Sequence, residues 1–546
     1  MPELSVSGKE VYHMYDGNEL WRPLLPLQMQ KRKYGALTYD TYAGLPENLY
    51  EALCRTARRD PDKICIVDDD GTEVSFGAFV EKVDAFAAYL RHEVHIRPGD
   101  HVALMMFNSL EFCVSFLAII KAGAVCLPLP SKFRQQEVLS LLEKADPNCI
   151  ICDEKFAEWM EPMRSSGIPV LVSGGTAGEY ALAHLLEDFD LREDMPCLAQ
   201  AGEPAILMFT SGTTSLSKGV VLTNFNVMHA VATYQKILDI TPEDSTIIAV
   251  PIYHVTGMIA LLGLFLYAGG TVYLHRTVRA ERVLQCVKDH NVTFIHGAPT
   301  VFSMLLQQAP NFPSLPSLRA FACGSSNMPK AKILALHKWL PNMAFRTVYG
   351  LTETSSPATI FPCDAAQSPY IGSSGLPVPG TVFRVMSEDG RELPPDEVGE
   401  IQLKGSVVLR EYYKMTIPAL SEDGWLSTGD LGYFTKDGYI FLVDRKKDMI
   451  NRGGEKICSY DVENELYHLP GIEEAAVVGI PDEVYGEVAA AVVKCSPGVT
   501  LTQEQVQTML HDKMAKYKIP AKILFLPEIP TTPNGKIDKK NIRNLF

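Results

Sequence analysis

The sequence reads Thr210-Ser211-Gly212-Thr213-Thr214-Ser215-Leu216-Ser217-Lys218-Gly219 between an apolar run at 205–209 and an expected helix that begins near Asn224. Backbone N–H groups freed by glycine, several hydroxyl donors and one lysine can together surround a polyphosphate. The stretch is not a Walker P-loop, because that motif needs Gly directly before Lys-Ser/Thr and Lys218 follows Ser217. It predicts a phosphate-binding loop. The alternative is a surface Ser/Thr loop that solvates itself.

Composition indicates a multidomain globular protein. The chain has 546 residues, of which 47% are apolar and 21% charged, so we expect two or more domains. Its formal charge of −15 opposes bulk affinity for nucleic acid or an acidic membrane. An anionic ligand must therefore be held by a local basic cluster, and one occurs near residue 450.

The twelve cysteines are scattered singly. Only Cys149-Ile150-Ile151-Cys152 has the spacing of metal ligands, and no second pair lies near it, so a zinc site is disfavoured. We expect reduced thiols in a cytoplasmic protein. The first ten residues lack a secretory signal, and the C-terminus matches no retention or peroxisomal address.

The most apolar stretch, 255–274, carries no charge and is long enough to span a membrane. Gly269-Gly270 would end a helix there, and Thr271-Val272-Tyr273-Leu274 reads as a buried strand. We therefore expect a helix over 256–267 followed by a strand inside an α/β core, and no integral membrane segment.

From residue 48 onward, strands alternate with helices, which predicts mostly parallel sheets covered on both faces. The fold class expected is α/β, with two doubly wound α/β subdomains. Residues 371–443 change to short alternating runs with turn signals, which predicts an antiparallel, barrel-like subdomain. The last hundred residues predict a small α+β domain, and residues 1–45 stay unassigned. We expect domains at 1–444 and 445–546, joined by the charged run Asp444-Arg445-Lys446-Lys447-Asp448.

Further polar motifs follow expected strands, at the edge where open α/β sheets bind ligands. Gly324-Ser325 follows the strand predicted at 318–323, and Tyr349-Gly350-Leu351-Thr352-Glu353 follows that at 345–348. Tyr349 offers a face for a purine, Thr352 a hydroxyl for phosphate, and Glu353 a hard oxygen for Mg²⁺. A solvated loop glutamate is the alternative for Glu353.

Together these motifs resemble the adenylate-forming (AMP-binding) superfamily, in its acyl-CoA synthetase branch. The phosphate loop is similar to Thr-Ser-Gly-Thr-Thr-Gly-x-Pro-Lys-Gly, with Ser215 in place of Gly and Ser217 in place of Pro. The pentapeptide 349–353, Ser427-Thr428-Gly429-Asp430 and Thr532-Pro533-Asn534-Gly535-Lys536 also match. The resemblance covers about residues 48 to 540 and implies ATP, Mg²⁺ and coenzyme A as cofactors or co-substrates.

The resemblance also implies a set of roles. Asp430 and Arg445 would bind the ribose, and Glu353 with Thr210 would hold Mg²⁺. The remaining nucleotide contacts implied are Ser211, Gly212, Thr213, Thr214, Lys218, Gly324, Ser325, Tyr349, Gly350 and Thr352.

Lys536 and His254 are the implied catalytic residues, together with Thr210. Lys536 would reach the carboxylate and the α-phosphate, and a fixed cation there stabilises developing charge. His254 would lie beside the reacting carboxylate, with Met258, Ile259 and Leu262 along one wall of the acyl pocket. Amino-acid-activating relatives carry Asp at this position, so the substrate is expected to lack an α-amino group.

Gly453-Gly454 resembles the loop that meets the pantetheine arm of CoA, and Lys447 occupies the family's hinge position. The expected reaction is ATP-dependent formation of an acyl-adenylate from a fatty or aryl acid, followed by transfer to CoA. Loading of a carrier protein is one alternative, and a nucleotide-binding regulator without turnover is another, motivated by Ser215 and Ser217. The partners expected are small molecules and no nucleic acid; a homodimer stays open.

Overall fold

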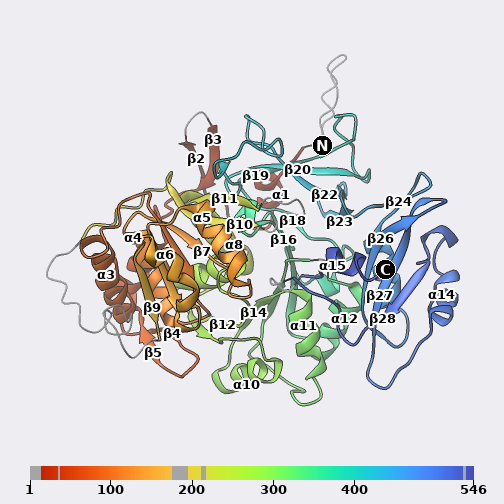
Figure 1. Ribbon diagram of the computed structural model, residues 1–546, viewed down its shortest axis with the longest axis horizontal. Helices are drawn as coiled ribbons and strands as arrows, with labels where there is room; N and C mark the ends of the chain where they lie inside the picture. Colours follow the sequence, from red (N-terminus) through yellow and green to blue (C-terminus); the bar gives the residue numbers. More distant parts are fainter. Residues whose placement is uncertain (1–13, 35–36, 175–194, 211–216, 327, 533–535) are drawn as a thin grey trace.

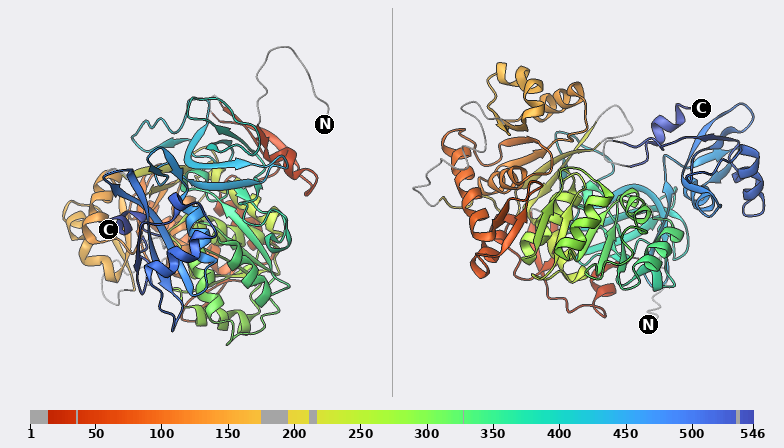
Figure 2. Two further views of the ribbon diagram at one scale, coloured as in Figure 1. Left: turned by 90° about the vertical axis from the view of Figure 1, so that its right-hand side faces the viewer. Right: turned by 90° about the horizontal axis from the view of Figure 1, so that it is seen from below.

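The computed structural model describes residues 14–34, 37–174, 195–210, 217–326, 328–532 and 536–546. Two large sheets and a curled antiparallel sheet form the main body, and a smaller sheet near the C-terminus lies to one side of it (Figure 1). Seen from below, the C-terminal part projects from the main body and is joined to it through the antiparallel region (Figure 2). The α/β fold class expected from the alternation of strands and helices is confirmed.

The first large sheet has the strand order β21-β11-β10-β7-β6-β8-β9, and its strands from β10 to β9 are parallel. The strand bounds are β6 His101–Met105, β7 Val125–Pro128, β8 Cys149–Asp153, β9 Val170–Ser173, β10 Pro204–Thr210, β11 Lys218–Thr223 and β21 Glu411–Tyr412. The helices on its outer face are α5 Gln135–Ala145, η1 Glu154–Met160 and α6 Glu161–Ser165. Strand β11 was not expected, because the prediction placed only a loop, at 210–219, before a helix that begins near Asn224.

The second large sheet has the order β18-β17-β16-β15-β14-β12-β13-β4-β5 and is parallel from β16 to β4. The strand bounds are β4 Ile64–Val67, β5 Glu73–Ser75, β12 Ser245–Ile248, β13 Thr271–Leu274, β14 Phe294–Gly297, β15 Ala320–Cys323, β16 Ala344–Tyr349, β17 Thr359–Ile360 and β18 Leu376–Pro377. Strand β4 precedes the first sheet in sequence but pairs with β13. An apolar run predicts that a strand is buried, and it does not specify which neighbour it pairs with.

One apolar core joins the two sheets. It contains fully buried side chains from the helices between them, such as Leu53, Phe116, Tyr234 and Phe265. These middle helices are α2 Leu49–Arg59, α3 Phe76–His92, α4 Leu110–Lys121, α8 Asn224–Leu238, η2 Thr256–Gly263 and α9 Leu264–Ala268. The outer face of the second sheet is covered by α10 Ala280–His290, α11 Pro299–Gln307 and α12 Lys330–Trp339. Each sheet is therefore covered on both faces, as expected for doubly wound subdomains.

The apolar stretch after residue 255 begins as a π-helix rather than the uniform helix expected. It covers Thr256–Gly263 and continues as α9 to Ala268, where Gly269 adopts φ +92° and ends the helix. A Cβ at Gly257 would lie 2.5 Å from the Cα of Ile252, so only glycine fits where this helix starts. Among the described residues, no helix is long and apolar enough to cross a membrane.

A five-stranded antiparallel sheet has the order β1-β19-β20-β22-β23, with four strands from residues 381–445 and β1 from the N-terminal part. Its strands are β1 Tyr15–Asp16, β19 Thr381–Met386, β20 Gly399–Gly405, β22 Leu426–Phe434 and β23 Ile440–Arg445. The antiparallel subdomain expected for 371–443 is confirmed. Two strands from this range are exceptions, because β18 belongs to the second large sheet and β21 to the first. The N-terminal part contributes β1, helix α1 Gly17–Trp21 and the hairpin β2 Met29–Tyr34 and β3 Leu37–Tyr42.

The C-terminal part is built on its own sheet and has separate apolar cores on the two faces. Its strands are β24 Ile450–Arg452, β25 Glu455–Ile457, β26 Ile472–Asp482, β27 Gly486–Cys495 and β28 Lys522–Phe525. Its helices are α13 Ser459–Tyr467, α14 Gln503–His511, η5 Lys516–Lys518 and α15 Lys539–Arg543. The short helices η3 Thr352–Thr354 and η4 Ala365–Gln367 complete the elements of the main body.

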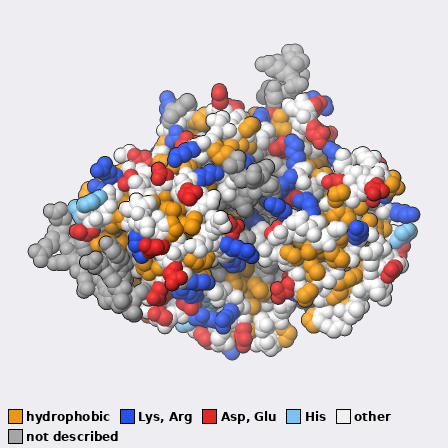
Figure 3. Space-filling model, in the orientation of Figure 1, with side chains coloured by type: hydrophobic (Ala, Val, Ile, Leu, Met, Phe, Trp, Pro, Cys, Tyr) orange, Lys and Arg blue, Asp and Glu red, His pale blue; other side chains and the backbone are white. Residues whose placement is uncertain are grey.

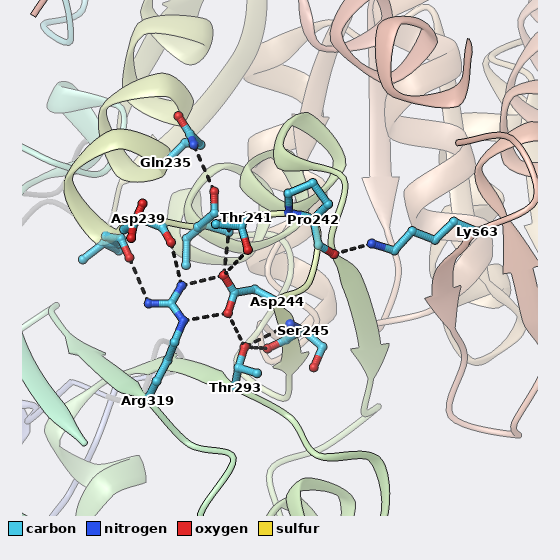
Figure 4. A network of polar contacts seen from close by, with 11 residues as sticks. Lys63, Gln235, Asp239, Thr241, Pro242, Asp244, Ser245, Thr293 and Arg319 are labelled. Carbon is cyan, nitrogen blue, oxygen red and sulfur yellow. Dashed lines mark hydrogen bonds and ion pairs between the residues drawn. The ribbon is translucent and has the colours of Figure 1, made fainter. Parts of the chain in front are cut away.

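A polar network fastens the amino ends of three strands in the second sheet (Figure 4). The Arg319 guanidinium donates to both carboxylate oxygens of Asp244 at 2.7 and 2.6 Å, and the Thr293 hydroxyl donates to the same carboxylate at 2.7 Å. Burial alone would raise the pKa of Asp244, but these hydrogen bonds hold it below its usual value. The opposite, carboxyl ends of the parallel strands carry the predicted site residues.

Candidate active site

A cavity of about 700 Å³ lies between the main body and the C-terminal part. A smaller cavity of about 50 Å³ shares several of its lining residues. Lys and Arg side chains gather along this hollow (Figure 3). Basic lining residues outnumber acidic ones by nine to six, although the whole chain carries −15. An anionic ligand would thus meet locally positive walls.

The predicted site residues come to the cavity from separate elements. Those among its lining residues are Thr210, Lys218, His254, Ser325, Thr352, Glu353, Asp430, Arg445 and Lys536, while Tyr349 and Gly350 line the smaller cavity. Several of them end or follow parallel strands, which explains the convergence, because the carboxyl ends of parallel strands meet at one edge. Gly324 directly follows β15 at this edge.

The phosphate loop leaves the first sheet between two paired strands. Thr210 on β10 is the register partner of Lys218 on β11, so the pair stands at the base of the loop. The Thr210 hydroxyl lies 3.5 Å from the carbonyl oxygen of Lys218. Residues Ser211, Gly212, Thr213 and Thr214 lie outside the described residues, as does Ser215.

Asp430 is held by two partners on neighbouring segments. The Tyr349 phenol donates to its Oδ2 atom at 2.8 Å, and Arg445 Nε lies 3.2 Å from its Oδ1 atom. Burial and the Asp430 carboxylate raise the pKa of Tyr349, so the phenol keeps its proton and donates. An ionised carboxylate offers about four acceptor positions, so two are left for a diol. The residues present therefore fit a ribose.

Two of the predicted nucleotide-binding glycines also have a steric reason in the fold. A Cβ at Gly350 would lie 1.6 Å from the carbonyl oxygen of Ser356, which forbids any side chain there. A Cβ at Gly324 would lie 3.1 Å from the carbonyl oxygen of Val348. Backbone packing beside the cavity accounts for both glycines without a ligand.

Glu353 lies in the short helix η3 and is fixed from outside its own loop. Leu409 N donates to its carbonyl oxygen at 2.8 Å, and the Tyr412 phenol lies 3.4 Å from its Oε1 atom. No group of three or more His, Cys, Asp or Glu that could hold a metal ion occurs among the described residues. One carboxylate with one hydroxyl suits Mg²⁺, which binds through one or two protein oxygens plus substrate phosphates.

Lys536 extends from the C-terminal part into the cavity. Burial and the neighbouring Arg445 lower its pKa to about 8, against the opposite influence of Asp430 and Glu353. The ammonium therefore shares one electrostatic environment with three other predicted site residues, namely Glu353 and Asp430 of the main body and Arg445 at the joint. A lysine so near the C-terminus would ordinarily be solvated, and the sequence alone does not exclude that state.

His254 lies in the turn between β12, which ends at Ile248, and the helix η2. It is half-buried on the cavity wall, with its ring centroid 4.7 Å from that of Tyr253. The apolar wall expected beside it is wrong in detail. Met258, Ile259 and Leu262 are fully buried in the core between the sheets and do not line the cavity, because the π-helix directs them inward. The apolar residues that line the cavity are instead Met208, Phe209, Pro299, Pro329 and Leu351 of the main body and Ile529 and Ile537 of the C-terminal part.

Gly453 and Gly454 lie away from both cavities, at the tip of the β24–β25 hairpin. Their φ angles are +59° and +97°, and Arg452 pairs with Glu455 across them, so they form a two-residue turn of the type that requires glycine. The same hairpin contacts the main body through Lys456, which lies 2.5 Å from Glu388.

Two residues at the site were not foreseen from the sequence: Lys332, which lines the cavity, and Tyr412, which contacts two of the lining residues. Lys332 donates to the Ser303 hydroxyl at 2.7 Å and lies over the Tyr467 ring at 5.0 Å, so it links the main body to the C-terminal part. Tyr412 contacts both Glu353 and Lys218. Neither residue belongs to a motif, and only the tertiary structure brings them to the site.

Comparison with known proteins identifies the family. The model of the AMP-binding enzyme family matches residues 53–413, and the AMP-binding enzyme C-terminal domain matches residues 461–536. The chain belongs to the AMP-binding enzyme family. It is therefore an enzyme, as the motif resemblance implied.

Relatives of this AMP-binding enzyme include two curated CoA ligases. A feruloyl-CoA synthase from Amycolatopsis is 32% identical, over 90% of this chain and 98% of the relative. The long-chain-fatty-acid–CoA ligase FadD13 from Mycobacterium tuberculosis is 31% identical, over 83% and 89%. Among solved structures, ATP-bound MatB from Rhodopseudomonas palustris has a TM-score of 0.83 and 28% identity, covering 91% of this chain and 99% of that one.

Proposed function

We propose that this enzyme uses ATP to convert a carboxylic acid without an α-amino group, of the fatty or aryl type, into an acyl-adenylate and then transfers the acyl group to coenzyme A. The observation that carries the proposal is the convergence of Thr210, Lys218, Asp430 and Lys536 on one positively lined cavity that also holds His254. The CoA ligases among its relatives support the same reaction class.

In the first half-reaction, a carboxylate oxygen attacks the α-phosphorus of ATP. The bond to the bridging oxygen breaks, pyrophosphate leaves, and the mixed anhydride of the acid and AMP remains. Lys536 supplies a fixed cation where charge develops on the carboxylate and α-phosphate. Asp430 and Arg445 orient the ribose, so most of the rate enhancement comes from positioning and charge stabilisation.

Glu353 and Thr210 would hold Mg²⁺ with the nucleotide phosphates. When bound, the ion neutralises phosphate charge. The Lys218 ammonium, which also lines the cavity, would add positive charge for the phosphates. Lys218 stands at the base of the loop whose glycine and hydroxyls were predicted to bind them.

In the second half-reaction, the thiol sulfur of coenzyme A attacks the acyl carbonyl carbon and AMP leaves. Gly453 and Gly454, predicted to meet the pantetheine arm, are not among the residues that line the cavity in which Lys536 lies. We therefore propose that the part after Asp444 rotates about Arg445–Lys447 between the half-reactions, which makes 1–444 and 445–546 separate domains. Asp430 would stay with the main body during this motion.

The acid is expected to be apolar near its carboxylate. Met208, Phe209 and Leu351, which line the same cavity as His254, are apolar. Burial of each methylene against such a wall stabilises the complex by about 0.8 kcal/mol. His254 itself occupies the position at which amino-acid-activating relatives carry Asp, which supports an acid without an α-amino group.

The deciding experiment is acid-dependent exchange of labelled pyrophosphate into ATP, with acids graded in length and ring size. Exchange that requires an apolar acid supports adenylation, whereas ATP binding without exchange for any acid would leave the regulator alternative motivated by Ser215 and Ser217. Discharge of the adenylate is then compared with CoA and with a phosphopantetheinyl carrier protein. If the carrier protein discharges the adenylate faster than CoA does, the carrier protein and not CoA is the acceptor.

A further inference from the structure

One segment of the antiparallel region, Ser406–Tyr413, crosses to the phosphate-binding side of the first sheet. Within it, β21 pairs with β11, so that Tyr412 is opposite Val220. Tyr413 N donates to the carbonyl oxygen of Gly219 at 2.8 Å. The segment is therefore hydrogen-bonded to β11, the strand that begins with Lys218 and Gly219 where the phosphate loop ends.

The same segment is fastened to the loop that carries Glu353. Leu409 N donates to the Glu353 carbonyl oxygen at 2.8 Å, and the Ser355 hydroxyl donates to the carbonyl oxygen of Val407 at 2.9 Å. Asn226 on α8 donates to the carbonyl oxygens of Ser406 and Val408 at 2.9 and 3.0 Å. The backbone of this segment is thus held at both the Lys218 strand and the Glu353 loop.

Tyr412 makes the corresponding side-chain link. Its hydroxyl lies 3.4 Å from Glu353 Oε1, and the Lys218 ammonium lies 5.7 Å from the centre of its ring. The tyrosine is only 6% exposed. A tyrosine phenol is ordinarily neutral, so it is the donor in this contact and the carboxylate is the acceptor. A buried ring of this kind has few alternative positions.

The link matters because Lys218 and Glu353 carry opposite charges at one cavity wall. Without an intervening group, the ammonium and the carboxylate would attract each other and form an ion pair. Neither would then be available to a ligand. None of the ion pairs among the described residues joins Lys218 to Glu353, and Tyr412 is the side chain that contacts both. The ring face attracts the cation, while the hydroxyl attracts the carboxylate.

We propose that Tyr412 is a positioning residue that holds the Glu353 carboxylate and the Lys218 ammonium in separate orientations, ready for a divalent cation and for phosphate respectively. The proposal rests on the proposed function, because it assigns those two ligands to the two side chains. Tyr412 itself need not touch either ligand. Its hydroxyl acts through Glu353, and its ring acts through Lys218.

The test measures equilibrium binding of ATP by calorimetry at a series of free Mg²⁺ concentrations and in excess chelator. Tyr412→Phe keeps the ring and removes the hydroxyl. We expect the gain in ATP affinity on adding Mg²⁺ to fall by about fivefold to tenfold, as for the loss of a hydrogen bond to a charged group. Affinity in chelator should stay within about twofold of wild type. Tyr412→Leu should lower affinity in chelator as well, because the cation–π contact is lost.

The neighbouring tyrosine provides a matched control. Tyr413 directly follows β21, and its hydroxyl lies 3.3 Å from the carbonyl oxygen of Ala145 rather than near Glu353. Tyr413→Phe should therefore leave the Mg²⁺ dependence unchanged. Thermal unfolding of each variant separates a loss of positioning from a loss of folding.

A double-mutant cycle with Glu353→Gln decides the route of action. If Tyr412 acts through Glu353, Tyr412→Phe should have no further effect on Mg²⁺-dependent binding once the carboxylate is gone. Additive losses, or equal losses with and without Mg²⁺ in Tyr412→Phe, would overturn the proposal. Failure of the wild type to catalyse acid-dependent exchange would refute the proposed reaction instead, and the binding results on Tyr412 would still stand.

Discussion

The Tyr349 phenol donates a hydrogen bond of 2.8 Å to Asp430, which lies 81 positions later in the chain. The first residue ends a strand of the second large sheet, and the second belongs to the antiparallel sheet. Arg445, at the end of the neighbouring strand, completes the contact at 3.2 Å. The predicted purine face and the predicted ribose carboxylate are thus one connected unit in which the tyrosine orients the aspartate.

Removing the phenol tests this unit. We expect Tyr349→Phe to weaken ATP binding by about threefold to tenfold, because the carboxylate loses a hydrogen bond that fixes its orientation. Asp430→Asn should weaken binding more, because the charge that accepts from the ribose and from Arg445 is lost. Calorimetric titration with ATP measures both. Tyr433→Phe, on the same strand as Asp430, is the control; equal effects in Tyr433→Phe and Tyr349→Phe would contradict the assignment.

The lowered pKa of Lys536 predicts a basic limb in the rate profile. The ammonium is the active form, so kcat/KM for ATP in acid-dependent pyrophosphate exchange should decline as pH rises through about 8, where the free enzyme loses this proton. Exchange contains no thiol step, so ionisation of CoA does not interfere. In Lys536→Arg the limb should disappear, because a guanidinium stays charged. Persistence of the limb near pH 8 in that variant would assign it to another group.

Lys536 should matter for one half-reaction only. We expect Lys536→Ala to lower adenylate formation by about 10²-fold to 10³-fold, the usual loss for a group that stabilises transition-state charge. Attack of the thiol on a supplied acyl-adenylate should be spared. Pyrophosphate release and thioester formation are measured separately. Equal losses in the two assays would indicate that Lys536 only stabilises the interface between the two parts of the chain.

His254 should influence the acid and not the nucleotide. His254→Ala is expected to change the relative kcat/KM values of short, long and aromatic acids by about tenfold, with ATP affinity near wild type, because the nucleotide contacts lie on other loops. His511→Ala serves as the control, since that side chain is 69% exposed. An unchanged preference among acids together with weakened ATP binding would show that His254 does not lie at the acyl pocket.

The proposed rotation predicts unequal effects at the joint. Proline at position 447 would fix φ near −65° and oppose a change of backbone torsions, so Lys447→Pro should impair one half-reaction much more than the other. Losses of equal size in both assays would argue against rotation there.

Contacts across the interface give a milder version of the same test. Glu388 pairs with Lys456 at 2.5 Å, and Gln307 donates to Glu473 at 2.6 Å, in the orientation that brings Lys536 into the cavity. The ionic pair is exposed, so Glu388→Ala should lower adenylation by no more than about fivefold. Thioester formation from supplied adenylate should not fall. A larger loss in the thioester assay would mean that this orientation serves the second half-reaction.

Much of the fold follows from local pattern. The helix at 224–238 begins where Thr223 caps it with a side-chain acceptor, and α4 begins at a similar cap on Ser109, so both starts could be read from the sequence. The start of strand β11 could not be read from the sequence, because its first residues, Lys218 and Gly219, belong to the hydroxyl-rich loop motif. The pairing of β4 with β13 could not be predicted from the sequence either, because an apolar run does not specify which strand it pairs with.

The sequence by itself determined the residue types of the site and the edge at which they gather: short motifs follow buried strands, and parallel strands bring their carboxyl ends together. Only the tertiary structure decided which residues hold these motifs in register. Tyr412 meets Glu353 and Lys218 because a strand from the antiparallel region joins the first large sheet, and Lys536 meets Arg445 because the C-terminal part packs against the main body. Such contacts depend on how separate sheets are arranged, and hydrophobic periodicity specifies burial within each element but not that arrangement.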